Sequence, residues 1–343
     1  MRLVVDGFGK FIGVENGLLV VKEKESSKKY RPDELKQLII AGKSAVSSEA
    51  IKLLARNGVD IVFIDRGEVV TRLSNPFAGT VKTRREQYLA YYDRRGVTIA
   101  REIVKAKMRN QSAILLNLAK SRKDSQPEIA QKLVEAKESV ERCFSELSSV
   151  EAEKIDEVRE RILGIEGKAS NFYWDAIAEI IPPNYNFRGR RGLEIGSPRN
   201  AQDIVNAMLN YGYAVLFSEC IRAVELAGLD PYAGFLHSDK SGRTSLALDL
   251  MECFRQHIVD RAVLKLIAFS QVKPEDCEFK NFTCQLKDGA RRALLSEVLE
   301  RLEDTTQYRG KNISMSSVIL SQAREIAKFL RGEGSYAGFV QNW

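Results

Sequence analysis

The hydrophobic periodicity of the chain changes near residue 80, and this change constrains the fold more than any other sequence feature. Residues 1–75 contain short runs rich in Val, Ile and Leu, separated by Asp-Gly, Asn-Gly and Arg-Gly turn pairs. One such pair, in VENGLLV, predicts a β-hairpin. After about residue 82, apolar residues recur every three or four positions, which is the period of helices. The sequence therefore predicts an α+β fold, with a small β-rich N-terminal domain and a larger all-α C-terminal domain.

Breaks in these two patterns set the expected boundaries. We expect the N-terminal domain at residues 1–75, a linker at 76–81 and the helical domain at 82–343. Inside the β-rich part, Ser47 precedes the apolar-periodic segment AIKLLARNG, which predicts one capped helix. Residues 181–200 are rich in Pro, Gly, Asn and Arg, so they are expected to form a surface loop between helices.

Composition limits where the protein can work. The sequence holds no run of about 18 apolar residues, so a membrane span is not expected. Its first residues, MRLVVDGFGKF, reach a polar turn before a signal-peptide core could form. Its five cysteines include no CxxC pair and are expected to be buried or idle thiols. These features predict a cytoplasmic protein.

The positive charge is concentrated in two short segments. The formal net charge is +7, but residues 81–112 alone carry 9 basic against 3 acidic side chains, and residues 181–201 carry 4 against 1. Clustered charge of this kind indicates a patch for a polyanion, although a solvated face is the usual fate of any single basic run. The side chains that we expect to contact DNA, on charge alone, are Arg84, Arg85, Arg101, Lys105, Lys107, Arg109, Arg188, Arg190 and Arg191.

A second cluster has the donor atoms of a metal site. Asp249 and Glu252 are three residues apart in an apolar helical pattern and share one helix face. His237 lies on the polar turn just before that helix. Carboxylate oxygens with an imidazole nitrogen suit Mn²⁺, Mg²⁺ or Zn²⁺. A solvated acidic stripe would explain the two acids equally well.

Glu166 is a third possible ligand. It lies between Gly164 and Gly167 in GIEGKASNFYW, inside a helical pattern. The two glycines weaken a helix, so they predict either the close approach of another backbone or ligand, or a break in the helix.

These motifs together resemble a known family. GIEGKASNFYWDAI, GLDPYAGFLH and SLALDLME occur in that order, as they do in the CRISPR-associated adaptation endonuclease/integrase family (CRISPR-associated protein one). The resemblance implies a metal-dependent DNA endonuclease and integrase that inserts captured DNA into the repeat array by 3′-hydroxyl attack on a phosphodiester. It also implies that Glu166, His237 and Glu252 bind Mn²⁺ or Mg²⁺, and that Asp249 is an auxiliary acid of the catalytic site.

The resemblance also implies partners. Members of this family form homodimers, here expected through the N-terminal domain, and join a second, smaller CRISPR adaptation protein on double-stranded DNA, possibly branched or single-stranded. Two other functions fit the same residues. A non-catalytic DNA-binding architectural protein would use the acids and His237 as a structural network, and a small-nucleotide metallohydrolase would not need two basic clusters. The C-terminal segment GEGSYAGFVQNW is expected to be either mobile or a docking strip for a partner.

Overall fold

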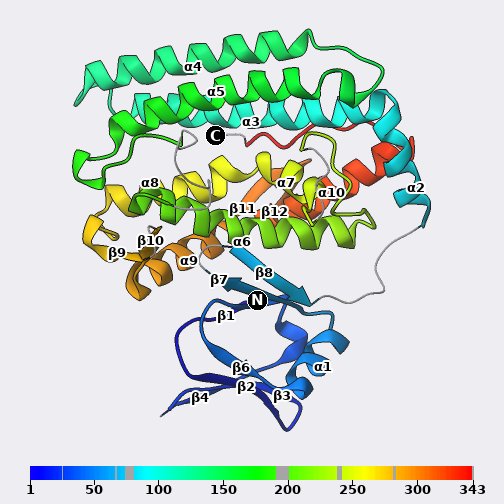
Figure 1. Ribbon diagram of the computed structural model, residues 1–343, viewed down its shortest axis with the longest axis vertical. Helices are drawn as coiled ribbons and strands as arrows, with labels where there is room; N and C mark the ends of the chain where they lie inside the picture. The colour runs from blue at the N-terminus through cyan, green and yellow to red at the C-terminus, as the bar shows by residue number, and fades with distance from the viewer. Residues whose placement is uncertain are drawn as a thin grey trace.

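The change of period near residue 80 separates two parts of the structure. The computed structural model describes residues 1–24, 26–65, 68–73, 81–190, 201–237, 242–280 and 283–341. Strands dominate the described residues up to 73, and long helices follow from residue 81 (Figure 1). The predicted linker, apart from Val81, lies outside the described residues. The α+β class predicted from the sequence is confirmed.

The N-terminal part contains two four-stranded sheets. One has the order β1-β5-β7-β8, with β1, β5 and β7 parallel and β8 antiparallel to β7; the other has the order β4-β3-β2-β6. Helix α1 follows β6. The elements are β1 (Arg2–Val5), β2 (Lys10–Glu15), β3 (Leu18–Lys22), β4 (Ser27–Tyr30), β5 (Gln37–Ile40), β6 (Ser44–Val46), α1 (Ser48–Arg56), β7 (Asp60–Asp65) and β8 (Glu68–Leu73).

Two local predictions in this part are confirmed. The predicted hairpin joins β2 to β3 through Asn16 and Gly17, which have φ angles of 51° and 75°. Positive φ at both turn residues is what the tightest hairpin turns require. Ser47 caps α1, because its hydroxyl accepts a hydrogen bond from the amide of Ala50 at 3.1 Å.

The sheet β1-β5-β7-β8 has two buried faces. Leu38 and Ile61 point into a small core shared with the second sheet and α1. Ile39 and Val62, one residue further along each strand, instead belong to the large core of the helical part. Successive side chains of a strand alternate between faces, so this sheet joins the two parts of the molecule.

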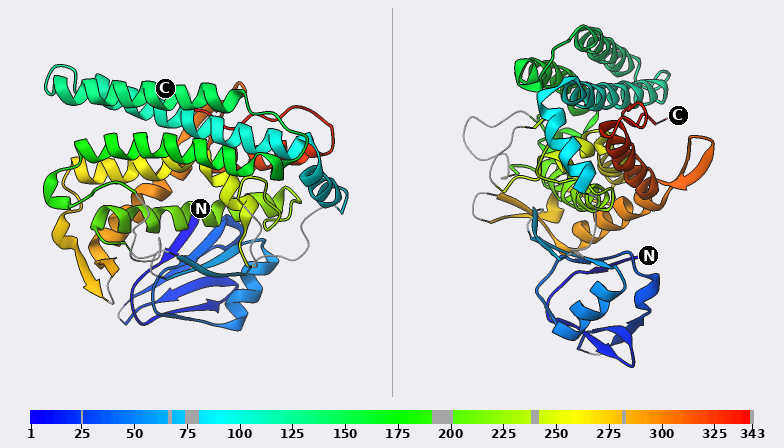
Figure 2. Two further views of the ribbon diagram at one scale, coloured as in Figure 1. Left: turned by 45° about the horizontal axis from the view of Figure 1, so that its top comes forward. Right: turned by 90° about the vertical axis from the view of Figure 1, so that its right-hand side faces the viewer.

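The helical part is layered (Figure 1). Helices α3, α4 and α5 form an outer layer, α6, α7, α8 and α10 lie beneath it, and the strands of residues 1–73 gather at the far end (Figure 2). Among the described helices, none combines the length and apolarity that a membrane span needs. The helices are α2 (Val81–Leu89), α3 (Arg94–Lys120), α4 (Pro127–Ser148), α5 (Arg159–Ile180), α6 (Ile204–Leu226), α7 (Ser245–Glu252), α8 (Arg261–Ala268), α9 (Asp288–Glu303) and α10 (Met315–Leu330).

The C-terminal part departs from the helical pattern in three places. Two short hairpins flank α9: β9 (Cys277–Lys280) pairs with β10 (Thr283–Leu286), and β11 (Thr305–Tyr308) pairs with β12 (Lys311–Ser314). The helical pattern that carries Asp249 and Glu252 does not continue as one α-helix, because α7 ends at Glu252 and a π-helix at Gln256–Asp260 precedes α8. The hairpins and the π-helix are features that the periodicity did not indicate.

The aromatic C-terminal segment packs on the chain itself. Tyr336 and Phe339 are both buried, and the ring of Phe339 stacks on Phe254 with centroids 5.2 Å apart. The side chain of Asn110 donates a hydrogen bond to the Phe339 carbonyl at 3.0 Å. Tyr336 and Phe339 are therefore part of the core, whereas residues 332–335 are exposed. The two expectations for the segment, mobility or a docking strip, stay predictions.

Buried ion pairs join the sheet to the helices. Arg72 of β8 pairs with Asp60 of β7 (Nε–Oδ1 2.6 Å) and with Glu225 near the end of α6. Asp60 is almost fully buried and also accepts a hydrogen bond from Gln37 at 2.9 Å. A buried carboxylate needs its cation, so these pairs hold the sheet against α6.

We expect Arg72→Met to lower the free energy of unfolding by about 3 kcal/mol, because it leaves a buried carboxylate without its cation. Arg31→Met is the matched control: Arg31 also pairs with an aspartate, Asp33, but both side chains are more than half exposed. That control should cost less than about 1 kcal/mol. Urea unfolding of both variants measures the difference, and equal losses would contradict a structural role for the buried pair.

Candidate active site

Three helices bring two carboxylates to one cation. Glu166 comes from the middle of α5, Glu252 is the last residue of α7, and Lys107 lies on α3 between them. The Lys107 ammonium lies 2.6 Å from Glu252 Oε2 and is also ion-paired with Glu166 Oε1. Ser170, one turn along α5, donates a hydrogen bond to the same Glu166 oxygen at 2.7 Å. The two predicted ligands from distant parts of the sequence therefore meet.

Neighbouring charges keep this cluster ionised. Burial raises the pKa of Glu252, but Arg255, Lys107 and His237 outweigh it and lower that pKa to about 2. Arg255 contributes directly, with its Nη2 2.8 Å from Glu252 Oε1. Burial lowers the pKa of Lys107, while Glu166 and Glu252 raise it by more. At neutral pH the buried carboxylate and both buried cations are therefore charged.

Asp249 organises the turn that carries His237. The carboxylate is fully buried and accepts backbone hydrogen bonds from Phe235 (2.7 Å), Leu236 (3.0 Å) and His237 (3.0 Å). Its Oδ1 also lies 2.7 Å from His237 Nδ1. This contact assigns the proton of the imidazole to Nδ1, which leaves Nε2 as the nitrogen that can bind a metal. Asp249 is thus placed beside the site as a support for His237.

A glycine lets the turn approach the helix. A Cβ on Gly234 would lie 2.7 Å from the Ser245 carbonyl carbon at the start of α7. Every larger side chain would push the turn away from α7, and with it the backbone amides that Asp249 binds.

Tyr213, Tyr173 and Asp260 form a second buried polar group, and Arg255 packs against it. The Arg255 guanidinium lies 4.6 Å from the ring centroid of Tyr213, and Tyr213 donates a hydrogen bond to Asp260 in the π-helix. Tyr173 donates to the other Asp260 oxygen at 3.0 Å. Burial raises the pKa of Asp260, although these hydrogen bonds lower it. Neither Arg255 nor Asp260 is among the site residues that the sequence predicts.

The side chains of the cluster include donor atoms that suit a divalent cation. As the described side chains stand, no group of three or more His, Cys, Asp or Glu is close enough to hold a metal ion. Glu166 and Glu252 already share one cation, however, and it is the ammonium of Lys107. A buried carboxylate (Glu252) and a partly buried one (Glu166) that converge on a positive charge have the donor chemistry of a Mn²⁺ or Mg²⁺ site.

The Lys107 side chain therefore does not lie on the DNA-facing surface that the sequence predicts for it. It was grouped with the basic residues that face DNA, whereas its side chain is 11% exposed and inside the acidic cluster. A signal for this was present in the sequence: residue 107 falls on the apolar period of α3, together with Ile103, Val104 and Gln111, which are all buried.

The other basic residues are distributed over several surfaces. Arg84 and Arg85 on α2 and Arg188 are exposed, as a DNA contact requires. Arg190 is half-buried: it donates to Asn210 at 3.1 Å and lies over the ring of Tyr213. Arg191 lies outside the described residues.

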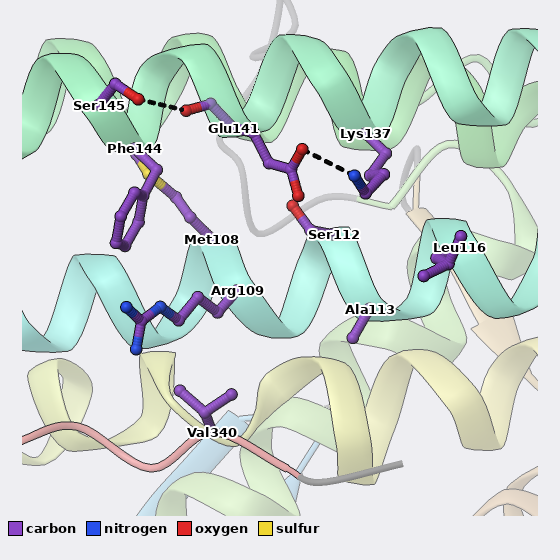
Figure 3. A pocket seen from close by; sticks show the side chains of 10 residues that line it. All are labelled: Met108, Arg109, Ser112, Ala113, Leu116, Lys137, Glu141, Phe144, Ser145 and Val340. Atoms are coloured by element: carbon purple, nitrogen blue, oxygen red, sulfur yellow. Dashed lines mark hydrogen bonds and ion pairs between the residues drawn. The ribbon is translucent and has the colours of Figure 1, made fainter.

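Besides Lys107, three of the basic residues that the sequence predicts to contact DNA lie on α3. Arg101 donates to the Val150 carbonyl at 2.8 Å, just after α4, and Lys105 pairs with Glu102 at 3.0 Å. Arg109 lies 4.8 Å from the ring centroid of Phe144, on the wall of a cavity of about 490 Å³ between α3 and α4 (Figure 3). Val340 closes the other side of that cavity. These cations are thus partly engaged within the protein.

The glycines beside Glu166 do not break the helix. Helix α5 runs without interruption from Arg159 to Ile180. Among the described residues, no atom lies within 4 Å of a Cβ placed on Gly164 or Gly167. The close approach of a described backbone segment is therefore not the reason for the glycines, and no described residue covers the surface of α5 at these two positions.

The two histidines have different surroundings. His257 is buried in the π-helix, and burial, with help from Arg261 and Arg301, lowers its pKa to about 3. It is therefore neutral across the physiological range and belongs to the core, away from the acidic cluster.

Comparison with known proteins agrees with this fold. Residues 3–300 match the model of the family described as CRISPR associated protein Cas1. A CRISPR-associated endonuclease Cas1 from Archaeoglobus fulgidus is 65% identical over 345 residues, covering 100% of both chains. A casposase bound to its integration product has a TM-score of 0.82 at 29% identity, over 98% of this chain and 92% of that one. The chain in a Cas6–RT–Cas1–Cas2 complex has a similar fold (TM-score 0.80, 21% identity), over 100% of this chain and 36% of that one.

These matches define the class of the protein, which is an endonuclease and integrase of CRISPR adaptation. Within that class, the chain belongs to the Cas1 family. The resemblance seen in the motifs of the sequence is confirmed.

The low pKa of His257 predicts a specific pH dependence. The unfolded chain binds a proton at His257 near pH 6.5 and the folded chain only near pH 3, so protonation favours unfolding as the pH falls. Between pH 8 and pH 5 the wild-type protein should lose about 2 kcal/mol more stability than His257→Gln. Urea unfolding at both pH values measures this, and a difference between the two proteins that stays constant with pH would contradict it.

Proposed function

We propose that Glu166, His237 and Glu252 hold the Mn²⁺ or Mg²⁺ ion of this Cas1 protein. The observation that carries the proposal is the convergence of the partly buried carboxylate of Glu166, from α5, and the buried carboxylate of Glu252, from α7, on one cation position. His237 interacts electrostatically with Glu252, and its Nε2 is the nitrogen not bound to Asp249. Two oxygen ligands and one imidazole nitrogen form a donor set for either ion.

The reaction is phosphodiester exchange. The 3′-hydroxyl oxygen of captured DNA forms a bond to a repeat phosphorus, and the bond from that phosphorus to its original 3′ oxygen breaks. With water as the nucleophile the same step is hydrolysis. When bound, the ion polarises the phosphoryl oxygen and neutralises charge on the leaving oxygen.

The neighbouring residues orient the ligands. Asp249 fixes the tautomer and position of His237 through Nδ1. Arg255 holds Glu252 Oε1 and helps to keep that carboxylate ionised. Asp249 therefore acts beside the ion and not on it.

Exposed basic residues would bind the DNA. Arg84, Arg85, Arg109 and Arg188 are exposed and can contact phosphates of double-stranded, branched or single-stranded DNA. Arg191, whose placement is not described, is included on its charge. Membership of the Cas1 family and the similar chain in the Cas1–Cas2 complex support a homodimer that joins Cas2 as its partner.

One observation favours the non-catalytic alternative. Lys107, Arg255, Glu166 and Glu252 form a closed network of ion pairs, as a structural role for the acids would require. An architectural protein with this network would bind DNA in a salt-sensitive way and would not break strands when metal is added.

Substitution of the three ligands separates these functions. We expect Glu166→Gln, His237→Ala and Glu252→Gln each to reduce Mn²⁺-dependent cleavage and strand transfer by at least about 100-fold, because an incomplete ligand set loses the ion. Glu179→Gln is the matched control: it removes a carboxylate of the same helix, which pairs with Lys132 on the surface. It should keep wild-type activity.

Two further readouts make the result decisive. Thermal melting shows whether each variant folds, and binding to labelled duplex DNA shows whether the nucleic-acid surface is intact. Folded variants that bind DNA and cut it at the wild-type rate would exclude these residues as the metal ligands.

A further inference from the structure

One ammonium group occupies the position between the two acidic ligands. Lys107 reaches Glu252 Oε2 at 2.6 Å and pairs with Glu166 Oε1, and its side chain is 11% exposed. Its long flexible stem starts on α3, a different helix from either carboxylate. The lysine thus bridges the same two groups that a divalent ion would bridge.

The oxygens of Glu252 are divided between two cations. Arg255 binds Oε1 at 2.8 Å, whereas Lys107 binds Oε2. The guanidinium is itself anchored over Tyr213, while the ammonium contacts the acids at the end of four rotatable bonds. Of the two cations, Lys107 is the one that can leave without disturbing the helix ends.

The balance of charge in the cluster requires that the Lys107 ammonium leave when a divalent ion binds. Glu166 and Glu252 carry two negative charges, and Lys107 and Arg255 carry two positive charges, so the cluster is neutral as it stands. A divalent ion added beside a buried ammonium would place like charges together where water does not screen them. The ion and the ammonium cannot both bind Glu166 Oε1 and Glu252 Oε2.

We propose that Lys107 is the resident cation of the Cas1 active site, and that a divalent metal ion binds by displacing its ammonium from Glu166 and Glu252. The lysine stabilises the two carboxylates when metal is absent, and it lowers the apparent affinity of the site for metal. This inference rests on the proposed assignment of Glu166 and Glu252 as ligands.

A second site in the same chain offers a matched control. Lys265 lies 2.6 Å from Glu297 Oε2, and Arg301 lies 2.9 Å from Glu297 Oε1. Glu297 is buried, as Glu252 is. This Lys–Glu–Arg group on α8 and α9 therefore repeats the arrangement around Glu252, but its lysine does not bridge a second carboxylate in any described contact.

The test compares Mn²⁺ binding by metal-free Lys107→Met, Lys265→Met and wild-type protein. Free Mn²⁺ is measured by electron paramagnetic resonance in the absence of DNA. We expect Lys107→Met to bind Mn²⁺ at least tenfold more tightly than the wild type, and Lys265→Met to bind it equally. Binding by Lys107→Met that is equal to or weaker than that of the wild type would overturn the proposal.

A measurement on the wild-type protein decides the question if Lys107→Met does not fold. Lysines are labelled with an amine-reactive reagent, with and without Mn²⁺, and the modified peptides are quantified by mass spectrometry. Lys107 should react several-fold faster with Mn²⁺ because its ammonium has left the carboxylates, while Lys265 should not change. Unchanged or slower labelling of Lys107 would overturn the proposal.

The same binding assay distinguishes failure of this inference from failure of the ligand assignment. If Glu166→Gln and Glu252→Gln bind Mn²⁺ as the wild type does, the assignment of ligands is wrong. If both lose Mn²⁺ but Lys107→Met shows no gain, the ligands stand and only the displacement of Lys107 is wrong.

Discussion

The buried carboxylate of Glu252 and the partly buried carboxylate of Glu166 need a cation between them to offset their repulsion, and this requirement shapes the centre of the molecule. Glu166 and Glu252 come from helices α5 and α7, and α3 brings the ammonium of Lys107 to both. The packing of the three helices and the ion pairs of the site therefore depend on each other. A helix shift that separated the acids from their cation would leave a buried charge without compensation.

Different neighbouring residues hold His237 and Glu252 in place. Asp249 binds three backbone amides and the imidazole of His237, so the turn and the histidine are fixed by one carboxylate. Arg255 is held over Tyr213, which itself bonds to Asp260 in a π-helix. π-Helical turns inside helices are frequent at functional sites, because they rotate the following residues relative to the regular pattern. Because a π-helix follows α7, Asp260 does not continue the helix face that carries Glu252.

Much of the fold could be predicted because it depends on local patterns. Asn16 and Gly17 define a hairpin, Ser47 defines a helix start, and the apolar period places most helices. Features that depend on tertiary contacts could not be predicted. The apolar period of α3 indicates that Lys107 is buried, but only the position of the acids in space reveals that it lies between them. The hairpins beside α9 and the π-helix are too short for periodicity to indicate.

We propose that Glu166, His237 and Glu252 form one metal site, and that the Lys107 ammonium occupies the position of the ion when metal is absent. A crystal structure of the protein with Mn²⁺, using the anomalous signal of manganese, tests it most directly. The account predicts a peak about 2.0–2.4 Å from Glu252 Oε2, a Glu166 oxygen and His237 Nε2, with the Lys107 ammonium moved away. A Mn²⁺ peak elsewhere, with Lys107 still bridging the two carboxylates, would contradict it.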